Sequence, residues 1–204
     1  MSAPAALTPE ARRALLTEYR AALGSAGAPE LPLIRALRAH WPPSIEALAG
    51  DDLAAELLVS APIYPLGLER ALTAVRRRLL LGGAGEGLLP FVARLAVQGH
   101  LNEYVWATDA EERAGVEGLA ARAGELAPID LMLLAAYAPL ARLPAAGTLL
   151  ARAWDAPVAA ILQEQVAAPH LERELAAQIP ALTPIRPGVS EAVRGQYEAH
   201  PYPR

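Results

Sequence analysis

Apolar residues recur at helical spacing from the first predicted element onward. Leu15, Leu16 and Tyr19 are spaced as one face of a helix requires. Thr8 supplies a capping hydroxyl before them, and Pro9 suits the first helical position because it needs no hydrogen-bond acceptor there. The pattern therefore predicts a helix that begins at about residue 9 and ends at Gly24.

Breaks in the apolar pattern divide the next sixty residues into four further helices. A second helix begins near Pro32 and stops before Pro42, because proline cannot donate a backbone hydrogen bond to the previous turn. Ser44 starts a short third helix, and Asp51 caps the fourth. A long fifth helix is expected over residues 66–81.

The second half of the chain has the same helical character. A glycine-rich stretch at 82–87 separates it from the first half, and a helix over 88–99 is followed by a loop over 100–107. Another helix begins near Thr108, where acidic residues crowd the first turn as the helix dipole favours. Prolines then divide the remainder into short helices at irregular intervals, which matches no fixed repeat.

Alternating β-branched runs do not occur, so the sequence predicts an all-α fold, an irregular multi-helix bundle without a sheet. The expected organisation is a helical subdomain (1–81), a glycine-rich linker (82–87), a second helical subdomain (88–195) and a Tyr/Pro linker (196–204). That last segment is expected to lead into a further domain beyond residue 204.

Composition excludes several classes of function. The net charge of −4 and the pI near 5.6 argue against a nucleic-acid-binding protein. Arg76-Arg77-Arg78 is the only basic run, and we expect it to form a solvated helix face with its outer arginines near carboxylates. The most apolar stretch, 127–141, is too short and too interrupted to span a bilayer, and the N-terminus does not resemble a signal peptide. With no cysteine in the chain, these features favour a cytoplasmic protein without disulfides.

Familiar catalytic and metal-binding patterns do not occur in the sequence. The four histidines lack the spacing of metal ligands, and no serine lies in a nucleophile elbow. The glycines at 83–87 imitate a nucleotide-binding turn, but they follow a helix instead of a buried strand, so a linker is favoured. Glu111 and Glu112 fit a helix start, where solvated charge explains them.

Two polar and aromatic clusters interrupt the Ala/Leu background. The first is the loop that contains Asn102, Glu103, Tyr104 and Trp106, and the second is centred on Tyr137. Because buried polar groups need partners, the amide and carboxylate of this loop either cap helix ends or line a cleft, and the structural interpretation is favoured. Tyr137 is expected to be an ordinary core ring or part of the same cleft.

Three segments, 102–105, 137–140 and 196–204, resemble the helical region of bacterial proteins of the tetratricopeptide-repeat methyltransferase type. The resemblance covers roughly residues 60–204. In that family the last segment is usually followed by a class I S-adenosylmethionine-dependent methyltransferase domain, and neither that domain nor the repeats occur in this chain. The resemblance implies an accessory module without a cofactor of its own, and S-adenosylmethionine would bind in the further domain. Docking on that domain would involve Gln196, Tyr197, Pro201, Tyr202, Pro203 and Arg204.

Three hypotheses about function follow. In the first, the chain is a noncatalytic helical module that packs on a methyltransferase domain and shapes a substrate or partner cleft. In the second, it is a stand-alone adaptor that binds a protein segment or oligomerises through an apolar groove containing Leu131, Leu134 and Tyr137. The third and weakest is a small helical enzyme that uses His100, Glu103 and Tyr104.

Overall fold

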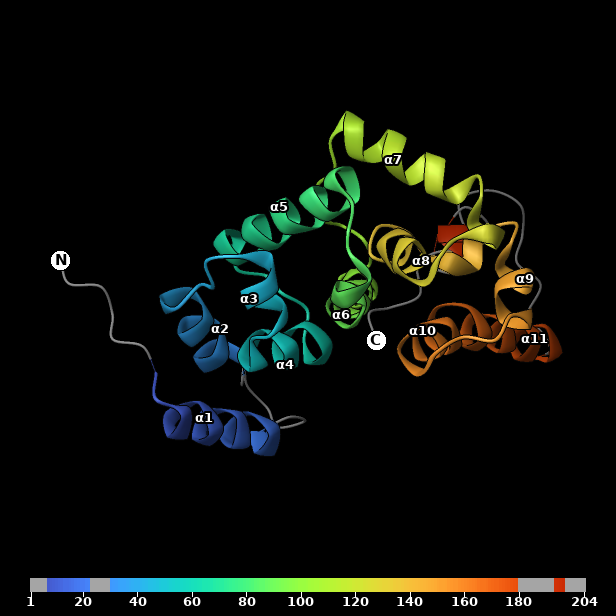
Figure 1. Cartoon of the computed structure of the whole chain (residues 1–204). Helices are drawn as coiled ribbons and strands as arrows, with labels where there is room; N and C mark the ends of the chain where they lie inside the picture. The colour runs from blue at the N-terminus through green and yellow to red at the C-terminus, as the bar shows by residue number, and fades with distance from the viewer. Residues whose placement is uncertain (1–6, 23–29, 180–192, 197–204) are drawn as a thin grey trace. The chain divides into compact units, whose positions relative to one another are not determined.

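The computed structural model describes residues 7–22, 30–179 and 193–196, and all regular structure within these ranges is helical (Figure 1). This confirms the predicted all-α fold. The chain divides into two compact units, Met1–Pro169 and His170–Arg204. We call them unit 1 and unit 2.

The helices follow one another along the chain with short connections. The α-helices are α1 (Pro9–Ala22), α2 (Glu30–Ala39), α3 (Ile45–Ala49), α4 (Asp52–Ser60), α5 (Leu66–Gly82), α6 (Leu89–Leu101), α7 (Ala110–Ala120), α8 (Pro128–Ala135), α9 (Ala146–Ala151), α10 (Ala156–Leu162) and α11 (Ala168–Gln178). Three 3-10 turns, η1 (Glu86–Leu88), η2 (Ala123–Glu125) and η3 (Leu140–Arg142), and one π-helical segment, η4 (Gln163–Ala167), lie between them.

Side-chain caps fix the starts of three predicted helices. Thr8, Ser44 and Asp51 each accept a hydrogen bond from the backbone N–H three residues further on, at 3.2, 3.1 and 2.9 Å. Each bond satisfies an N–H that has no partner within its own helix. The predicted starts of α1, α3 and α4 are therefore confirmed, whereas the predicted stop at Gly24 lies outside the described residues.

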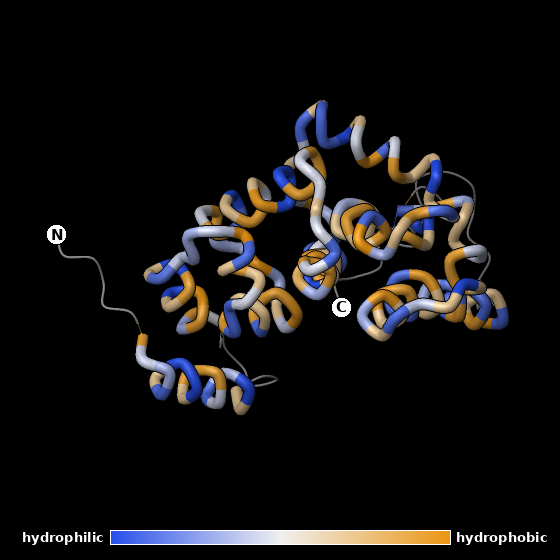
Figure 2. The backbone as a smooth tube through the Cα atoms, in the orientation of Figure 1, coloured by the Kyte–Doolittle hydropathy of each residue, from blue (hydrophilic) through white to orange (hydrophobic). Residues whose placement is uncertain are grey.

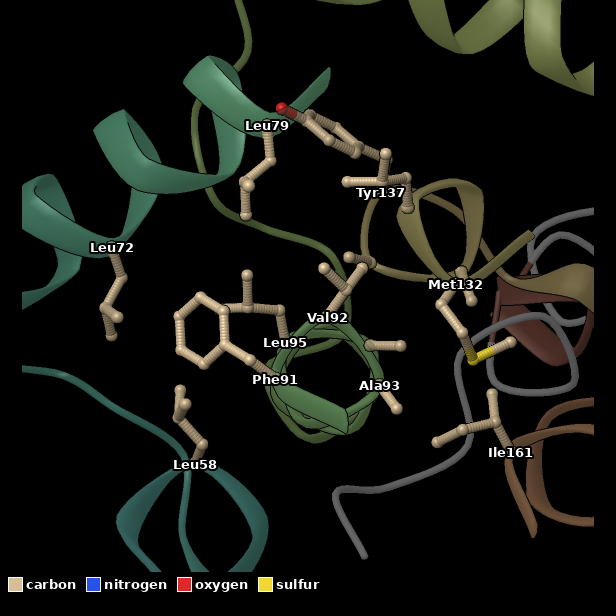
Figure 3. Packing of buried hydrophobic residues seen from close by; sticks show 14 of the residues in the cluster. Leu58, Leu72, Leu79, Phe91, Val92, Ala93, Leu95, Met132, Tyr137 and Ile161 are labelled. Atoms are coloured by element: carbon tan, nitrogen blue, oxygen red, sulfur yellow. The ribbon is translucent and has the colours of Figure 1, made fainter. Parts of the chain in front are cut away.

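Helix α6 is central to the core of unit 1, with α4, α8 and α10 packed against it. Figure 3 shows Phe91 of α6 facing Leu58 and Leu72, while Ala93 faces Ile161 on another side of the helix. All five side chains are buried. Burial of each large apolar side chain contributes roughly 1.5–3 kcal/mol, so contacts around α6 supply much of the stability of unit 1.

A buried glutamine on α6 connects it to the segment that follows α4. The Gln98 side-chain amide donates to the carbonyls of Leu58 and Ala61 at 3.1 and 2.9 Å, and its oxygen accepts from the N–H of Ile63 at 2.9 Å. These bonds satisfy the polar groups of Gln98, which removes the cost of burying them.

Helix α6 crosses close to the C-terminal end of α8 at Gly99. A Cβ atom added to Gly99 would lie 2.8 Å from the carbonyl oxygen of Ala136, closer than the two atoms can approach. The absence of a side chain at this position therefore sets how near the two backbones lie.

The boundary predicted at 82–87 lies within unit 1. Gly83 has a positive φ of 81°, which glycine adopts without steric cost, and η1 then leads directly into α6. Buried residues before and after this stretch, such as Leu79 and Phe91, belong to one hydrophobic cluster.

Hydrophobic residues make up much of α8, as Figure 2 shows, and most of them are buried in unit 1. None of the described helices is both long enough and apolar enough to cross a membrane.

Candidate functional site

The structure brings Trp106 and Tyr137 together around a residue that the sequence analysis assigned to the surface. Arg76 of α5 is only 1% exposed. Its guanidinium carbon lies 3.8 Å from the centroid of the Tyr137 ring and 5.5 Å from that of Trp106. A guanidinium at these distances is attracted by the negative face of each ring. We call Arg76, Trp106, Tyr137 and Glu112 the arginine cluster.

Hydrogen bonds hold the Arg76 guanidinium between two loops. Nη1 donates to the carbonyl of Ala136 at 3.1 Å, and Nη2 donates to the carbonyl of Ala107 at 3.1 Å. No partner of Arg76 Nε is found among the described residues. Burial lowers the pKa of Arg76, while the charge of Glu112 acts in the opposite direction. Arg76 thus joins α5 to the segment before α7 and to the end of α8.

Glu112 completes the arginine cluster from α7. The Tyr137 hydroxyl donates to Glu112 Oε1 at 2.7 Å, and Oε2 of the same carboxylate accepts from the N–H of Asp109 at 2.9 Å. Asp109 in turn accepts from the N–H of Glu112 at 2.8 Å, which forms a capping box at the start of α7. The interpretation of Glu112 as a solvated helix-start charge is therefore wrong, since this side chain is buried and has two donors.

The basic run was expected to form a solvated helix face with its outer arginines near carboxylates; this is wrong at Arg76, which is buried, whereas Arg78 at the other end is exposed. Arg77, the middle arginine of the run, pairs with Asp109 at 2.6 Å and also with Glu111. Arg76 instead occupies the buried stripe of α5 with Leu72 and Leu79. Arg76 comes four residues after Leu72 and three before Leu79, so helical spacing in the sequence already placed it on the buried face.

Burial limits the chemistry that the arginine cluster can perform. All four side chains are buried. Burial raises the pKa of the Tyr137 phenol, and the hydrogen bond to Glu112 raises it further, so the phenol stays protonated at neutral pH. Its proton is already donated to Glu112. The geometry suits a structural connection between helices better than acid–base catalysis.

The loop after α6 begins at the C-terminal end of that helix. Asn102 is the C-cap of α6, and its side-chain oxygen accepts from the N–H of Tyr104 at 3.1 Å. Glu103 and Tyr104 both have left-handed backbone conformations, with φ of 56° and 61°. Such residues cost free energy unless their surroundings fix them, and here the Asn102 side chain and the Gly99 carbonyl both bind the N–H of Tyr104.

The side chains of this loop do not converge on one site. Glu103 is exposed, whereas the rings of Tyr104 and His100 meet edge to face with 6.4 Å between centroids. Burial raises the pKa of Tyr104. Its hydroxyl and the side-chain nitrogen of Asn102 are buried without a hydrogen-bond partner among the described residues. The functional roles assigned to these residues stay predictions.

Other predicted site residues lie elsewhere. Leu131, Leu134 and Tyr137 are buried in the core of unit 1, so the apolar surface groove expected from them is not formed. Gln196 lies exposed in the helical turn over 193–196. The remaining docking candidates, Tyr197, Pro201, Tyr202, Pro203 and Arg204, lie outside the described residues. Within the described part of the chain, no three His, Asp or Glu side chains are placed to hold a metal ion.

Stability is expected to fall at high pH because of Tyr104 and Tyr137. In the unfolded chain a tyrosine ionises near pH 10, whereas burial raises both pKa values in the folded protein. Their contribution is therefore fully present below about pH 10 and is lost as the pH rises through the folded pKa values. The chain has no lysine or cysteine to titrate in this range. Each tyrosine should lower the free energy of unfolding by about 1.4 kcal/mol per pH unit above pH 10.

Urea unfolding at pH 9, 10, 11 and 11.5 measures this slope. Tyr137→Phe should make the slope shallower, whereas Tyr64→Phe is a matched control that should leave it unchanged, because Tyr64 is 76% exposed. An equal effect of the two substitutions would contradict the assignment.

Comparison of the chain with protein-family models, with curated protein sequences and with solved structures finds no significant match.

Proposed function

We propose that the chain is a noncatalytic helical module that packs on a catalytic domain of the S-adenosylmethionine-dependent methyltransferase type and helps to shape its substrate or partner cleft. The observation that carries the proposal is an apolar row on α11. Leu171 and Leu175 lie four residues apart on α11 and are 55 and 52% exposed, and Ile179, one residue past the end of the helix, is 72% exposed.

Spacing by four residues places Leu171 and Leu175 on one face of the helix. Single exposed apolar residues are normal on a protein surface, but a continuous row more often marks a contact with another protein. A helix with such a row binds by laying it into a groove of its partner. The catalytic domain is the proposed partner because the segment that resembles the methyltransferase family, 196–204, follows α11 in the sequence.

The arginine cluster supports the noncatalytic part of the proposal. Its charged groups already have partners: Arg76 donates to two backbone carbonyls, and Glu112 accepts from the Tyr137 hydroxyl and from a backbone N–H. An active site needs at least one such group directed at a substrate. In unit 1, these polar groups instead connect α5, α7 and α8.

Photolabelling with a reactive S-adenosylmethionine analogue tests the proposal. In extracts of source cells, the labelled polypeptide should either contain this sequence within a mass above 21.5 kDa or co-purify with it. The isolated 204-residue chain should neither be labelled nor bind S-adenosylmethionine in calorimetry. Stoichiometric binding by the isolated chain would overturn the noncatalytic role, and co-purification with unlabelled proteins alone would favour the adaptor.

Introducing negative charges into the exposed apolar side of α11 tests the docking surface. The double variant Leu171→Asp/Leu175→Asp should abolish co-purification, or crosslinking within a longer chain, while circular dichroism stays unchanged. Val59→Asp is the matched control, because Val59 is an apolar residue of α4 with 43% exposure. Loss of association in the control alone would place the docking surface elsewhere.

A further inference from the structure

A pocket opens on unit 1 between the C-terminal end of α3 and the start of α6. Its volume is about 650 Å³, within the range of small-molecule sites. Leu88, Pro90 and Phe91 supply apolar lining, and the charged side chains of Glu46 and Arg94 lie at its walls. None of these five residues belongs to the arginine cluster or to α11.

The two charged side chains differ in how their charge is balanced. Glu46 lies beside the N-terminus of its own helix, where hydrogen bonds from its backbone N–H and from Ser44 lower its pKa, and the charge of Arg78 adds to this effect. Arg94 has no hydrogen-bond or ion-pair partner among the described residues, although it is only partly exposed. The pocket therefore offers one unpaired cation beside an apolar wall.

We propose that this pocket binds a small monocarboxylic acid. The carboxylate accepts hydrogen bonds from the Arg94 guanidinium, and the apolar body of the acid covers Leu88, Pro90 and Phe91. A guanidinium presents paired donors that match a carboxylate. The carboxylate of Glu46 disfavours a dianion such as phosphate, because Arg94 is the only cation among the residues that line the pocket.

Two glycines at the rim make the pocket easy to block without disturbing the fold. A Cβ atom added at Gly85 or Gly87 would meet no other atom within 4 Å, and neither residue has a positive φ. A larger side chain at Gly87 therefore enters open space beside the pocket. Gly87→Leu is expected to remove binding while the protein stays folded.

Titration of the ¹⁵N-labelled 204-residue protein with 4-phenylbutyrate tests the proposal. Saturable shifts are expected in the amide signals of Gly50, Gly85 and Gly87, which line the pocket. The uncharged analogue 4-phenylbutyramide should bind at least about tenfold more weakly, since a hydrogen bond between charged groups is stronger than one to a neutral amide. Inorganic phosphate at equal ionic strength should not compete.

Variants separate recognition at this pocket from nonspecific binding. Arg94→Gln should weaken the carboxylate to the level of the amide, and Arg94→Lys should restore part of the loss. Arg122→Gln is the matched control, because Arg122 lines a different pocket of about 280 Å³. Equal binding of acid and amide, an unchanged affinity of Arg94→Gln, or shifts confined to other residues would each overturn the proposal. The test does not involve α11, so its result is independent of the proposed docking surface.

Discussion

Replacing Arg76 by methionine is expected to lower the free energy of unfolding by about 3 kcal/mol. Methionine fills similar space, so the loss comes from polar groups and not from a cavity. The carbonyls of Ala136 and Ala107 lose their charged donor, and the ring of Tyr137 loses the cation above it. Buried Glu112 also loses the compensating charge beside Tyr137.

Arg77→Met is the matched control for this substitution. Arg77 is the next residue of α5, but its side chain is 41% exposed and forms surface ion pairs with Asp109 and Glu111. Exposed ion pairs of this kind contribute little to stability. Urea unfolding of both variants at pH 7 measures the difference. Losses of equal size would mean that the arginine cluster contributes no more than a surface ion pair.

Gly99→Ala is expected to lower the free energy of unfolding by about 2–3 kcal/mol. The new Cβ atom would overlap the carbonyl oxygen of Ala136, which is backbone and can give way only if α6 and α8 move apart. Alanine favours helix over glycine by up to about 1 kcal/mol, so a net loss requires the steric cost to exceed that gain.

Gly118→Ala is the matched control for Gly99→Ala. Gly118 lies on α7, and a Cβ atom there meets nothing within 4 Å. This variant should be more stable than the original chain by about 0.5–1 kcal/mol. Thermal and urea unfolding of both variants measure the contrast. Stabilisation by Gly99→Ala would mean that the two helices separate at little cost.

The two sites share an atom, so their effects should not add. The Ala136 carbonyl oxygen that faces Gly99 also accepts the hydrogen bond from Arg76 Nη1. Movement of α8 away from α6 would therefore disturb the Arg76 hydrogen bond as well. In the double variant Arg76→Met/Gly99→Ala, the loss should be smaller than the sum of the single losses.

Local signals in the sequence were sufficient to predict where several helices begin. Thr8, Ser44 and Asp51 cap the helices predicted from them, because each cap bonds to a backbone group only three residues away. The Asn102 side chain also bonds locally, to the N–H two residues further on in the loop. The all-α fold follows from such local patterns summed along the chain.

The composition of the candidate site was only partly accessible from the sequence. Trp106 and Tyr137 were singled out as polar-aromatic positions, but nothing near them in the sequence indicates that they share one cation. Arg76 was assigned to the surface because it stands in a run of three arginines. Its spacing from Leu72 and Leu79 favours the buried face, and the structure follows this spacing and not the charge.

The sequence by itself determined where helices begin, which faces are apolar and that no sheet is predicted, because these depend on residues within about one helical turn of each other. Only the tertiary structure decided that Arg76 is buried, that Glu112 receives the Tyr137 hydroxyl, and that Gly99 lies against α8. Those contacts join residues 25 to 60 positions apart. The packing of separate helices selects them, so a buried charge becomes possible only where distant carbonyls and rings meet around it.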